Sequence, residues 1–312
     1  MEKPHLLILA PLAEFLMLEL TNHYHCHFGR TADELEEALT NAGDQISGVV
    51  GNGGSVVTDA LLARLPAAKI VAINGVGYDG VDVRACAERG VRVTNTPDVL
   101  TDDVADIAVA LVLMTSRQLI IANRDLHSGN WAAGTNRLTH KASGKRAGIV
   151  GLGRIGKAIA RRLAAFDMQI GYFGRHRQDV EHRYFDDLTE LAVWCDFLIV
   201  ACPGGPQTFH LITSEVLAAL GTTGTLINVA RGPVVDEQAL IVALETGGIR
   251  GAGLDVFENE PHVPEALLKR SDVALLPHVG SATSETRGAM AQLVLDNLEA
   301  HFQNRPLLTA VV

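Results

Sequence analysis

The chain has 312 residues, of which 47% are hydrophobic, and its formal net charge is −10. This length predicts two domains, and the negative charge argues against nucleic acid or an anionic membrane as a partner. Four cysteines without CxxC spacing are typical of a reduced, cytoplasmic protein. No apolar run approaches the roughly 20 residues that a membrane helix needs. A cleaved signal is not expected either, because Glu14 and Glu19 directly follow the first apolar run.

The first part of the chain alternates short apolar runs with helical segments. We expect strands over 5–12, 24–28, 48–50, 69–73 and 91–93, and helices over 14–20, 32–40, 59–65 and 82–88. Thr31 and Glu34 have the spacing of a capping box, which sets the start of the second helix. This alternation predicts a parallel sheet with helices on both faces. His23, His25 and His27 would share one strand face, where a polar surface is favoured over a metal site.

A long apolar segment begins at Thr101 and is expected to form one helix to about Leu126. It is apolar on more than one face, which favours wide burial and a place in a subunit interface. The loop expected over 128–143 contains Trp131. That side chain would either reach the active site of a partner subunit or pack locally.

A glycine-rich turn joins a short strand to a helix in the middle of the chain. Residues 147–150 are apolar and β-prone, residues 151–156 read GLGRIG, and apolar side chains then recur at helical spacing over 158–166. The strand before the turn and the helix after it are the context that makes this motif a predictor of a dinucleotide site.

Each glycine of the turn has a separate task in such a site. Gly151 permits the tight turn, Gly153 lets the backbone approach a pyrophosphate, and Gly156 lets the helix pack closely on the strand. The first N–H groups of the helix, including those of Arg154 and Ile155, would point at the anion, and the helix dipole would favour its charge.

Further apolar runs predict the rest of a second parallel sheet. We expect its other strands over 168–173, 197–201, 225–230, 250–254 and 273–276. Arg231, Asp255 and His278 fall at or just beyond the carboxyl ends of three of them. Ligands of doubly wound folds bind at those ends, so these three side chains are candidates for a shared site.

Two positions suggest where the chain passes between its domains. The first crossing is expected at Pro97, and a helix expected over 283–302 would return the chain to the first domain. The predicted fold class is therefore α/β with two doubly wound parallel-sheet domains, one comprising residues 1–97 and 284–312 and the other residues 98–283.

The end of the second strand of this later sheet predicts the cofactor. Sites that prefer NAD usually have an acidic residue there, but the aligned position is Gly174, and Arg175 and Arg177 follow it. Two guanidinium groups would bind a 2′-phosphate, and no carboxylate would repel it. We therefore expect a preference for NADP(H), with a solvated surface loop as the alternative.

Three side chains have the chemistry that reduction of a keto acid by hydride requires. Arg231 can pair with a carboxylate in a bidentate way and polarise a carbonyl. His278 can protonate the new alkoxide, and Glu260 can stabilise its imidazolium form. Each residue alone is a weak signal, but their order and their placement after strands support one another.

Five stretches of the chain together resemble the D-2-hydroxyacid dehydrogenase family along nearly its whole length. They are NGVGYD at 74–79, GLGRIG at 151–156, NVARGP at 228–233, GAGLDVFENEP at 251–261 and LPHVGS at 276–281. The resemblance implies a Rossmann cofactor domain inserted into a flavodoxin-like substrate domain. It also implies a homodimer that reduces small 2-keto acids to D-2-hydroxy acids.

The resemblance also implies roles for individual residues. Arg231 would bind the substrate carboxylate and carbonyl, His278 would be the general acid and Glu260 its partner. The main-chain N–H groups of Val76 and Gly77 would hold the substrate carboxylate. The other implied substrate contacts are Asn52 and Gly53. Asp255 would orient the nicotinamide amide, and the adenosine side would be lined by Cys202, Pro203 and Thr208. The other implied cofactor contacts are Gly151, Gly153, Arg154, Ile155, Gly156, Gly174, Arg175, Arg177, Val229, Ala230, Arg231, His278 and Gly280.

Within the family, residues 49–52 and the two arginines resemble NADPH-dependent glyoxylate/hydroxypyruvate reductases and plant hydroxyphenylpyruvate reductases. Those relatives often carry Ser or Thr where this chain has Gly53 and Gly54. The extra room leaves open a bulkier substrate such as phenylpyruvate, hydroxyphenylpyruvate or 2-ketogluconate. A cofactor-gated binding protein without turnover is a further alternative.

Overall fold

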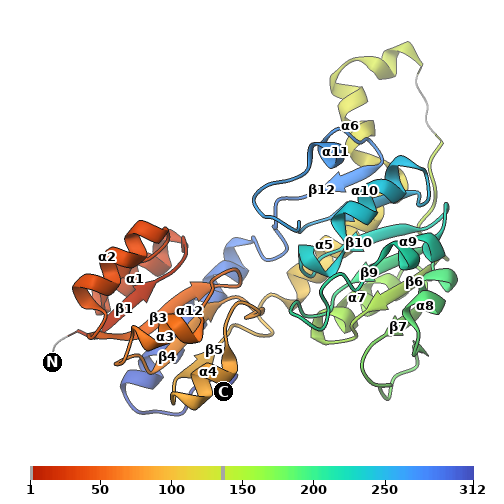
Figure 1. Cartoon of the computed structure of the whole chain (residues 1–312). Helices are drawn as coiled ribbons and strands as arrows, with labels where there is room; N and C mark the ends of the chain where they lie inside the picture. The colour runs from red at the N-terminus through yellow and green to blue at the C-terminus, as the bar shows by residue number, and fades with distance from the viewer. Residues whose placement is uncertain (1–2, 135–137) are drawn as a thin grey trace. The chain divides into compact units, whose positions relative to one another are not determined.

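The computed structural model describes residues 3–134 and 138–312. Its chain divides into two compact units (Figure 1). Unit 1 comprises residues 1–100 and 282–312, and unit 2 comprises residues 101–281. Each unit contains one sheet with parallel pairing between its strands. The predicted fold class, two doubly wound α/β domains, is confirmed.

Unit 1 has a five-stranded sheet with the order β2-β1-β3-β4-β5, which is the flavodoxin-like order. The strands are β1 (His5–Ile8), β2 (His25–Phe28), β3 (Ile46–Asn52), β4 (Ile70–Asn74) and β5 (Arg92–Thr94). The helices are α1 (Glu14–His23), α2 (Ala32–Ala42), α3 (Asp59–Ala63), α4 (Val83–Glu88) and α12 (Ser284–Phe302). The Thr31 side chain accepts a hydrogen bond from the main-chain nitrogen of Glu34 at 3.2 Å, so the predicted cap of α2 is confirmed.

Helices cover both faces of this sheet because alternate strand residues point in opposite directions. One face presents Leu7, Val49 and Val71 to a cluster that includes buried side chains of α2, α3 and α4. The other face presents Leu6, Val50 and Ile70 to buried side chains of α1 and α12. The strands are therefore buried on both sides, which explains why their sequences read as continuous apolar runs.

Unit 2 has a seven-stranded sheet with the order β12-β11-β10-β9-β6-β7-β8, the doubly wound dinucleotide-binding order extended by one strand. The strands are β6 (Arg146–Val150), β7 (Gln169–Phe173), β8 (Arg183–Phe185), β9 (Phe197–Val200), β10 (Thr225–Asn228), β11 (Gly251–Leu254) and β12 (Val273–Leu275). The helices are α5 (Thr101–Arg117), α6 (Leu119–His127), α7 (Arg154–Ala164), α8 (Leu188–Trp194), α9 (Ser214–Leu220), α10 (Glu237–Glu245) and α11 (Glu265–Leu268), with 3₁₀ turns η1 (Asn130–Ala133) and η2 (Gly232–Val234).

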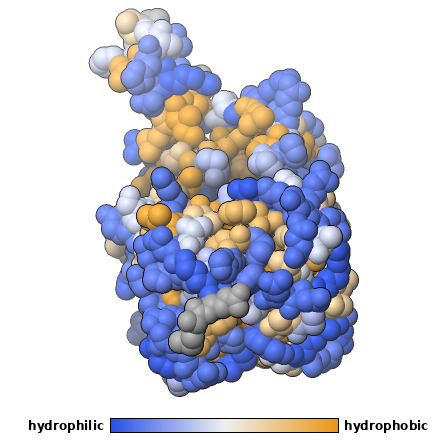
Figure 2. Space-filling model, turned by 90° about the vertical axis from the view of Figure 1, so that its left-hand side faces the viewer, coloured by the Kyte–Doolittle hydropathy of each residue, from blue (hydrophilic) through white to orange (hydrophobic). Residues whose placement is uncertain are grey.

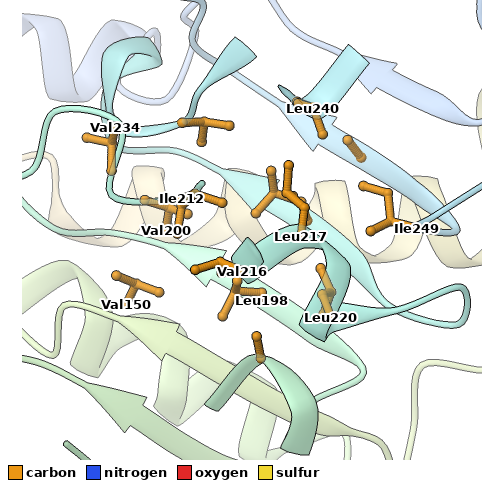
Figure 3. Close-up of a cluster of buried hydrophobic side chains, with 14 of the residues drawn as sticks. Val150, Leu198, Val200, Ile212, Val216, Leu217, Leu220, Val234, Leu240 and Ile249 are labelled. Carbon is orange, nitrogen blue, oxygen red and sulfur yellow. The ribbon is translucent and has the colours of Figure 1, made fainter. Parts of the chain in front are cut away.

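A large apolar cluster holds the helices of unit 2 on its central strands. Val150, Leu198 and Val200 point from the sheet toward side chains of α9 such as Val216 and Leu217 (Figure 3). The cluster continues to α8 and α10, and its central members are fully buried. This packing fixes the strands, so the loops at their carboxyl ends start from rigid positions.

The expectation of one helix from Thr101 to about Leu126 is wrong. The segment forms two helices, α5 and α6, which are bent by 64° where Gln118 adopts a left-handed φ of 48°. Just before the break, the hydroxyl of Thr115 donates to the Leu111 carbonyl at 2.7 Å, and such side chains compete with the helical backbone. Wide burial holds for α5 alone, because Leu126 and other apolar side chains of α6 are exposed.

Two smaller expectations also change. The apolar pattern of the sequence does not predict strand β8, because this strand has only three residues and lies at the edge of the sheet. His23 is the last residue of α1 and does not belong to strand β2 with His25 and His27. His27 instead lies 2.9 Å from His5 between ring nitrogens, across the β1–β2 pair.

No single helix in residues 3–134 and 138–312 is long and apolar enough to cross a membrane. The bent pair α5 and α6 passes that test together, on length and composition only. Most residues of α5 are buried or half-buried.

Candidate active site

The glycine turn after β6 is built by close contacts that exclude larger residues. Gly151 has a φ of 96°, and a Cβ atom there would lie 2.7 Å from the Cα of Cys202. A Cβ on Gly156 would lie 2.2 Å from the carbonyl oxygen of Gly151. Both positions therefore require glycine, one for its backbone conformation and its neighbour, the other for close approach of α7 to β6.

The same turn leaves space at the N-terminus of α7. Gly153 is the N-cap of this helix and has no side chain to cap the first turn, and nothing lies within 4 Å of the position its Cβ would take. The start of an 11-residue helix that has no side-chain cap is suited to a pyrophosphate. The residues present therefore fit a dinucleotide.

The loop after β7 extends this region. Gly174 has open space around its Cβ position, and Arg175 and Arg177 are exposed. In the loop after β9, the Thr208 hydroxyl donates to the Pro203 carbonyl at 2.7 Å. Both loops leave the carboxyl ends of strands that pair with β6, so they border the glycine turn.

Arg231 follows β10 in a turn that the side chain of Asn228 organises. The Oδ1 atom of Asn228 accepts from the main-chain nitrogen of Ala230 at 3.0 Å, and its Nδ2 donates to the Arg231 carbonyl at 3.0 Å. The Asn228 side chain is buried, so these bonds satisfy groups that water cannot reach. The turn fixes where the Arg231 side chain leaves the sheet.

The imidazole of His278 and the carboxylate of Glu260 form the central contact. Nδ1 of His278 lies 2.8 Å from Oε2 of Glu260, and the other oxygen of Glu260 accepts from the main-chain nitrogen of Phe257 at 3.1 Å. Burial acts to raise the pKa of Glu260, but the His278 hydrogen bond and the charges of His278 and Arg231 outweigh it, so the pKa lies below its ordinary value. The structure thus joins His278 to Glu260, and the charge of Arg231 acts on the same carboxylate.

Asp255 holds the turn that carries His278. Its carboxylate accepts hydrogen bonds from the main-chain nitrogens of Val279 and Gly280, both at 2.8 Å. The residue is 2% exposed, and burial raises the pKa of its carboxyl despite these two bonds. Asp255 therefore supports the backbone that follows His278. The expected contact of Asp255 with the nicotinamide amide is a separate role.

The expected substrate contacts of unit 1 lie on two neighbouring loops. Asn52 ends β3, and its Oδ1 accepts from the main-chain nitrogen of Gly54 at 2.9 Å. Val76 and Gly77 follow β4, which pairs with β3, and the Val76 carbonyl accepts from Asn95 at 2.8 Å. Gly53 faces the second loop, since its nitrogen is 3.4 Å from the Cβ position of Gly75.

The described residues contain no group of three or more His, Cys, Asp or Glu side chains that could hold a metal. The strand histidines make ring contacts with each other instead: His5 lies 4.9 Å from His25 and 5.1 Å from His27 between ring centroids.

Comparison with known proteins shows the family of the chain. The model of the D-isomer specific 2-hydroxyacid dehydrogenase NAD-binding domain matches residues 109–280. The chain belongs to the D-isomer specific 2-hydroxyacid dehydrogenase family.

Individual relatives match the chain over its full length. It is 48% identical to glyoxylate/hydroxypyruvate reductase A of Arabidopsis thaliana and 48% identical to the hydroxyphenylpyruvate reductase of Plectranthus scutellarioides, covering 100% of both chains in each case. A solved NADPH-dependent glyoxylate/hydroxypyruvate reductase of Sinorhizobium meliloti, in complex with NADP and malonate, superposes with a TM-score of 0.94 at 44% identity. That match covers 100% of this chain and 97% of the solved one.

Two residues that sequence reasoning missed support the site. Asn228 is a polar residue that ends an otherwise apolar strand, and that position was the available signal. Gln178 lies in the polar loop after β7, and its side chain donates to the Leu152 carbonyl in the glycine turn at 2.8 Å. Its sequence context gives no signal of this contact.

Proposed function

We propose that this protein catalyses the NADPH-dependent reduction of small 2-keto acids, with glyoxylate and hydroxypyruvate as substrates, to D-2-hydroxy acids. The observation that carries the proposal is the 2.8 Å contact between Nδ1 of His278 and Oε2 of Glu260. The charge of Arg231 helps to lower the pKa of that carboxyl. The names of the full-length relatives support the same reaction. Unit 2 would hold the cofactor, and unit 1 would supply substrate contacts.

The reduced nicotinamide, when bound, supplies the hydride that reaches the carbonyl carbon. Arg231 pairs with the substrate carboxylate and polarises the carbonyl oxygen. Glu260 occupies Nδ1 of His278, so the proton for the new alkoxide leaves from Nε2. Asp255 keeps the His278 turn in place through two main-chain bonds, and a position for the nicotinamide amide beside it is part of the proposal.

The preference for NADPH rests on the loop after β7. Arg175 and Arg177 offer two cations, and Gly174 offers no carboxylate that would repel a 2′-phosphate. The solved relative from Sinorhizobium meliloti is named as NADPH-dependent. A titration of both nicotinamides, with kcat/KM for each, measures this preference.

Main-chain N–H groups of Val76 and Gly77 would receive the substrate carboxylate, and Asn52 and Gly53 would lie beside it. A bulkier substrate remains the alternative, because the Cβ position of Gly54 meets only the Asn52 side chain, at 3.5 Å. Relatives named as hydroxyphenylpyruvate reductase and 2-ketogluconate reductase favour the same alternative.

We further propose a cytoplasmic homodimer. Apolar side chains are exposed on the arm formed by α6 and η1, namely Leu119, Ile120, Leu126 and Trp131. The arm projects from the rest of unit 2 (Figure 1), and its surface mixes apolar and polar residues (Figure 2), as expected for an interface. Each of the four cysteines is free in the described structure, which suits a reducing compartment.

The main test is a panel of glyoxylate, hydroxypyruvate, phenylpyruvate, hydroxyphenylpyruvate and 2-ketogluconate with NADPH and with NADH. We expect the highest kcat/KM for glyoxylate or hydroxypyruvate with NADPH, and a fall in kcat of about 10²–10⁴ for His278→Asn. Highest activity on a bulkier acid would select the alternative. Cofactor binding without turnover of any keto acid would indicate a binding protein and overturn the proposal.

The dimer has its own test. Light scattering after size exclusion should give twice the chain mass, and Leu126→Glu should give the monomer. Trp131→Ala should raise KM for the substrate if Trp131 reaches the partner's active site. Unchanged dimer formation and unchanged KM in Trp131→Ala would show that this residue has only a local role.

A further inference from the structure

Two side chains outside the catalytic group hold the loop that carries the two arginines. The hydroxyl of Tyr172, a residue of β7, accepts from the main-chain nitrogen of Gln178 at 2.7 Å and donates to the Gln178 carbonyl at 3.4 Å. At the other end of the loop, the Tyr184 hydroxyl donates to the Gly174 carbonyl at 3.3 Å. Residues 174–178 are thus bonded at both ends, and the arginines lie between the two bonded positions.

The anchor of this loop is rigid. Tyr172 is fully buried, although its hydroxyl is polar, and Gln178 satisfies that hydroxyl. Its ring packs on that of Tyr184 with 5.3 Å between centroids. If the loop moved away, the buried hydroxyl of Tyr172 would lose its hydrogen-bond partner. This cost restricts the loop to few conformations.

Gln178 also joins this loop to the glycine turn. Its side-chain Nε2 donates to the carbonyl of Leu152 at 2.8 Å, a contact across 26 positions of sequence. Leu152 lies between Gly151 and Gly153, in the turn that would hold the pyrophosphate. One side chain therefore connects the backbone of the pyrophosphate turn to the backbone that carries Arg175 and Arg177.

We infer that Gln178, anchored by Tyr172, is a positioning residue for the 2′-phosphate of the cofactor and sets the preference for NADPH over NADH. This inference rests on the proposed function. The pyrophosphate and the 2′-phosphate belong to one ligand and are separated by a ribose. A direct tie between their two binding segments fixes the distance between them before the ligand arrives, which lowers the ordering cost of binding. NADH has no 2′-phosphate and does not use that fixed distance.

The experiment measures dissociation constants of NADPH and NADH by nucleotide fluorescence, together with Tm. Gln178→Met keeps the length of the side chain and removes its donor, and Gln169→Met at the exposed start of β7 is the matched control. We expect Gln178→Met to weaken NADPH by about five- to tenfold and NADH by less than about twofold. The affinity for the fragment adenosine 2′,5′-bisphosphate should fall as that for NADPH does. The affinity for ADP should change as little as that for NADH.

A second background separates positioning from general support of the fold. In the Arg175→Ala/Arg177→Ala protein, Gln178→Met should leave the ratio of NADPH to NADH affinity unchanged, because its effect passes through the arginines. Tyr172→Phe should shift the same ratio in the otherwise unaltered protein, which provides a second variant if Gln178→Met is poorly folded.

Several results would overturn the inference. They are an equal loss of NADPH and NADH binding in Gln178→Met, no change in either, and an effect that persists without the arginines. Equal NADPH and NADH affinity in the unaltered enzyme would instead refute the proposed cofactor preference, and with it this inference, before any variant is made.

Discussion

The main-chain nitrogen of His278 donates to the carbonyl oxygen of Asp255 at 2.8 Å, and His278 itself has a left-handed φ of 52°. The Asp255 side chain then accepts from the next two main-chain nitrogens, those of Val279 and Gly280. One buried residue therefore accepts three hydrogen bonds, which together hold a backbone conformation that is unusual for a histidine. They place the imidazole beside Glu260.

Asp255→Asn should destabilise unit 2 and reduce activity. A carboxylate accepts at both oxygens, whereas an amide accepts at one and donates at the other, so one of the two buried N–H groups would lose its acceptor. That loss costs about 1–3 kcal/mol, and urea unfolding measures it. Asp296→Asn, at a half-buried residue of α12 whose carboxylate accepts from Gln292 in an exposed hydrogen bond, is the control. Unchanged stability of Asp255→Asn would show that the turn does not depend on these bonds.

The contact of Glu260 with His278 should make stability depend on acid pH. Because the pKa of Glu260 is lowered in the folded protein, its stabilising effect is present above the ordinary carboxyl pKa of about 4.3 and is lost as pH falls through the folded value. The difference in Tm between the unaltered protein and Glu260→Gln should therefore be largest near neutral pH and shrink as the pH falls below about 4.3. Glu265→Gln, in an exposed pair with Lys269, should show no comparable difference.

Two glycines of one turn should respond differently to alanine. Gly151→Ala introduces a Cβ at 2.7 Å from the Cys202 backbone with a φ of 96°, so we expect a clearly lower Tm. Gly153→Ala meets no atom within 4 Å, so its Tm should be preserved while the methyl group reaches the space meant for the pyrophosphate. A folded Gly153→Ala protein that binds NADPH normally would contradict the assignment of this turn.

A carboxylate at the end of β7 should reverse the cofactor preference. Gly174→Asp has open space for its side chain, so folding should be unaffected. The new carboxylate would accept hydrogen bonds from the ribose hydroxyls of NADH, and its charge would repel a 2′-phosphate. We expect kcat/KM for NADPH to fall by about tenfold or more and that for NADH to rise. Gly174→Asn, which is similar in size and uncharged, is the control for the charge.

The four thiols should react slowly in the native protein. Burial raises the pKa of Cys26, Cys86 and Cys202 to about 11 and that of Cys195 to about 12. At pH 8, roughly one thiol in a thousand would be ionised at a pKa of 11, and the thiolate is the reactive form. A disulfide reagent that absorbs on reaction should detect four thiols quickly only after denaturation. A rapidly reacting thiol in the native protein would show that one of them is activated.

The sequence by itself determined the class of fold and indicated which side chains make up the proposed catalytic group. Apolar runs alternating with helical segments required two parallel sheets, because such strands must be buried on both faces. Parallel strands also end at one edge of a sheet. Arg231, Glu260 and His278, each placed after a strand of unit 2, were therefore expected in one region although they are far apart in the chain.

Only the tertiary structure decided which hydrogen bonds hold these side chains in place and where a helix predicted from periodicity breaks. The bend at Gln118 divides a segment whose apolar pattern is continuous, so periodicity alone could not reveal it. The supporting bonds of Asn228, Asp255 and Gln178 join backbone groups on separate turns or loops. Such hydrogen bonds depend on distances and angles set by the packed strands and leave no periodic trace in the sequence.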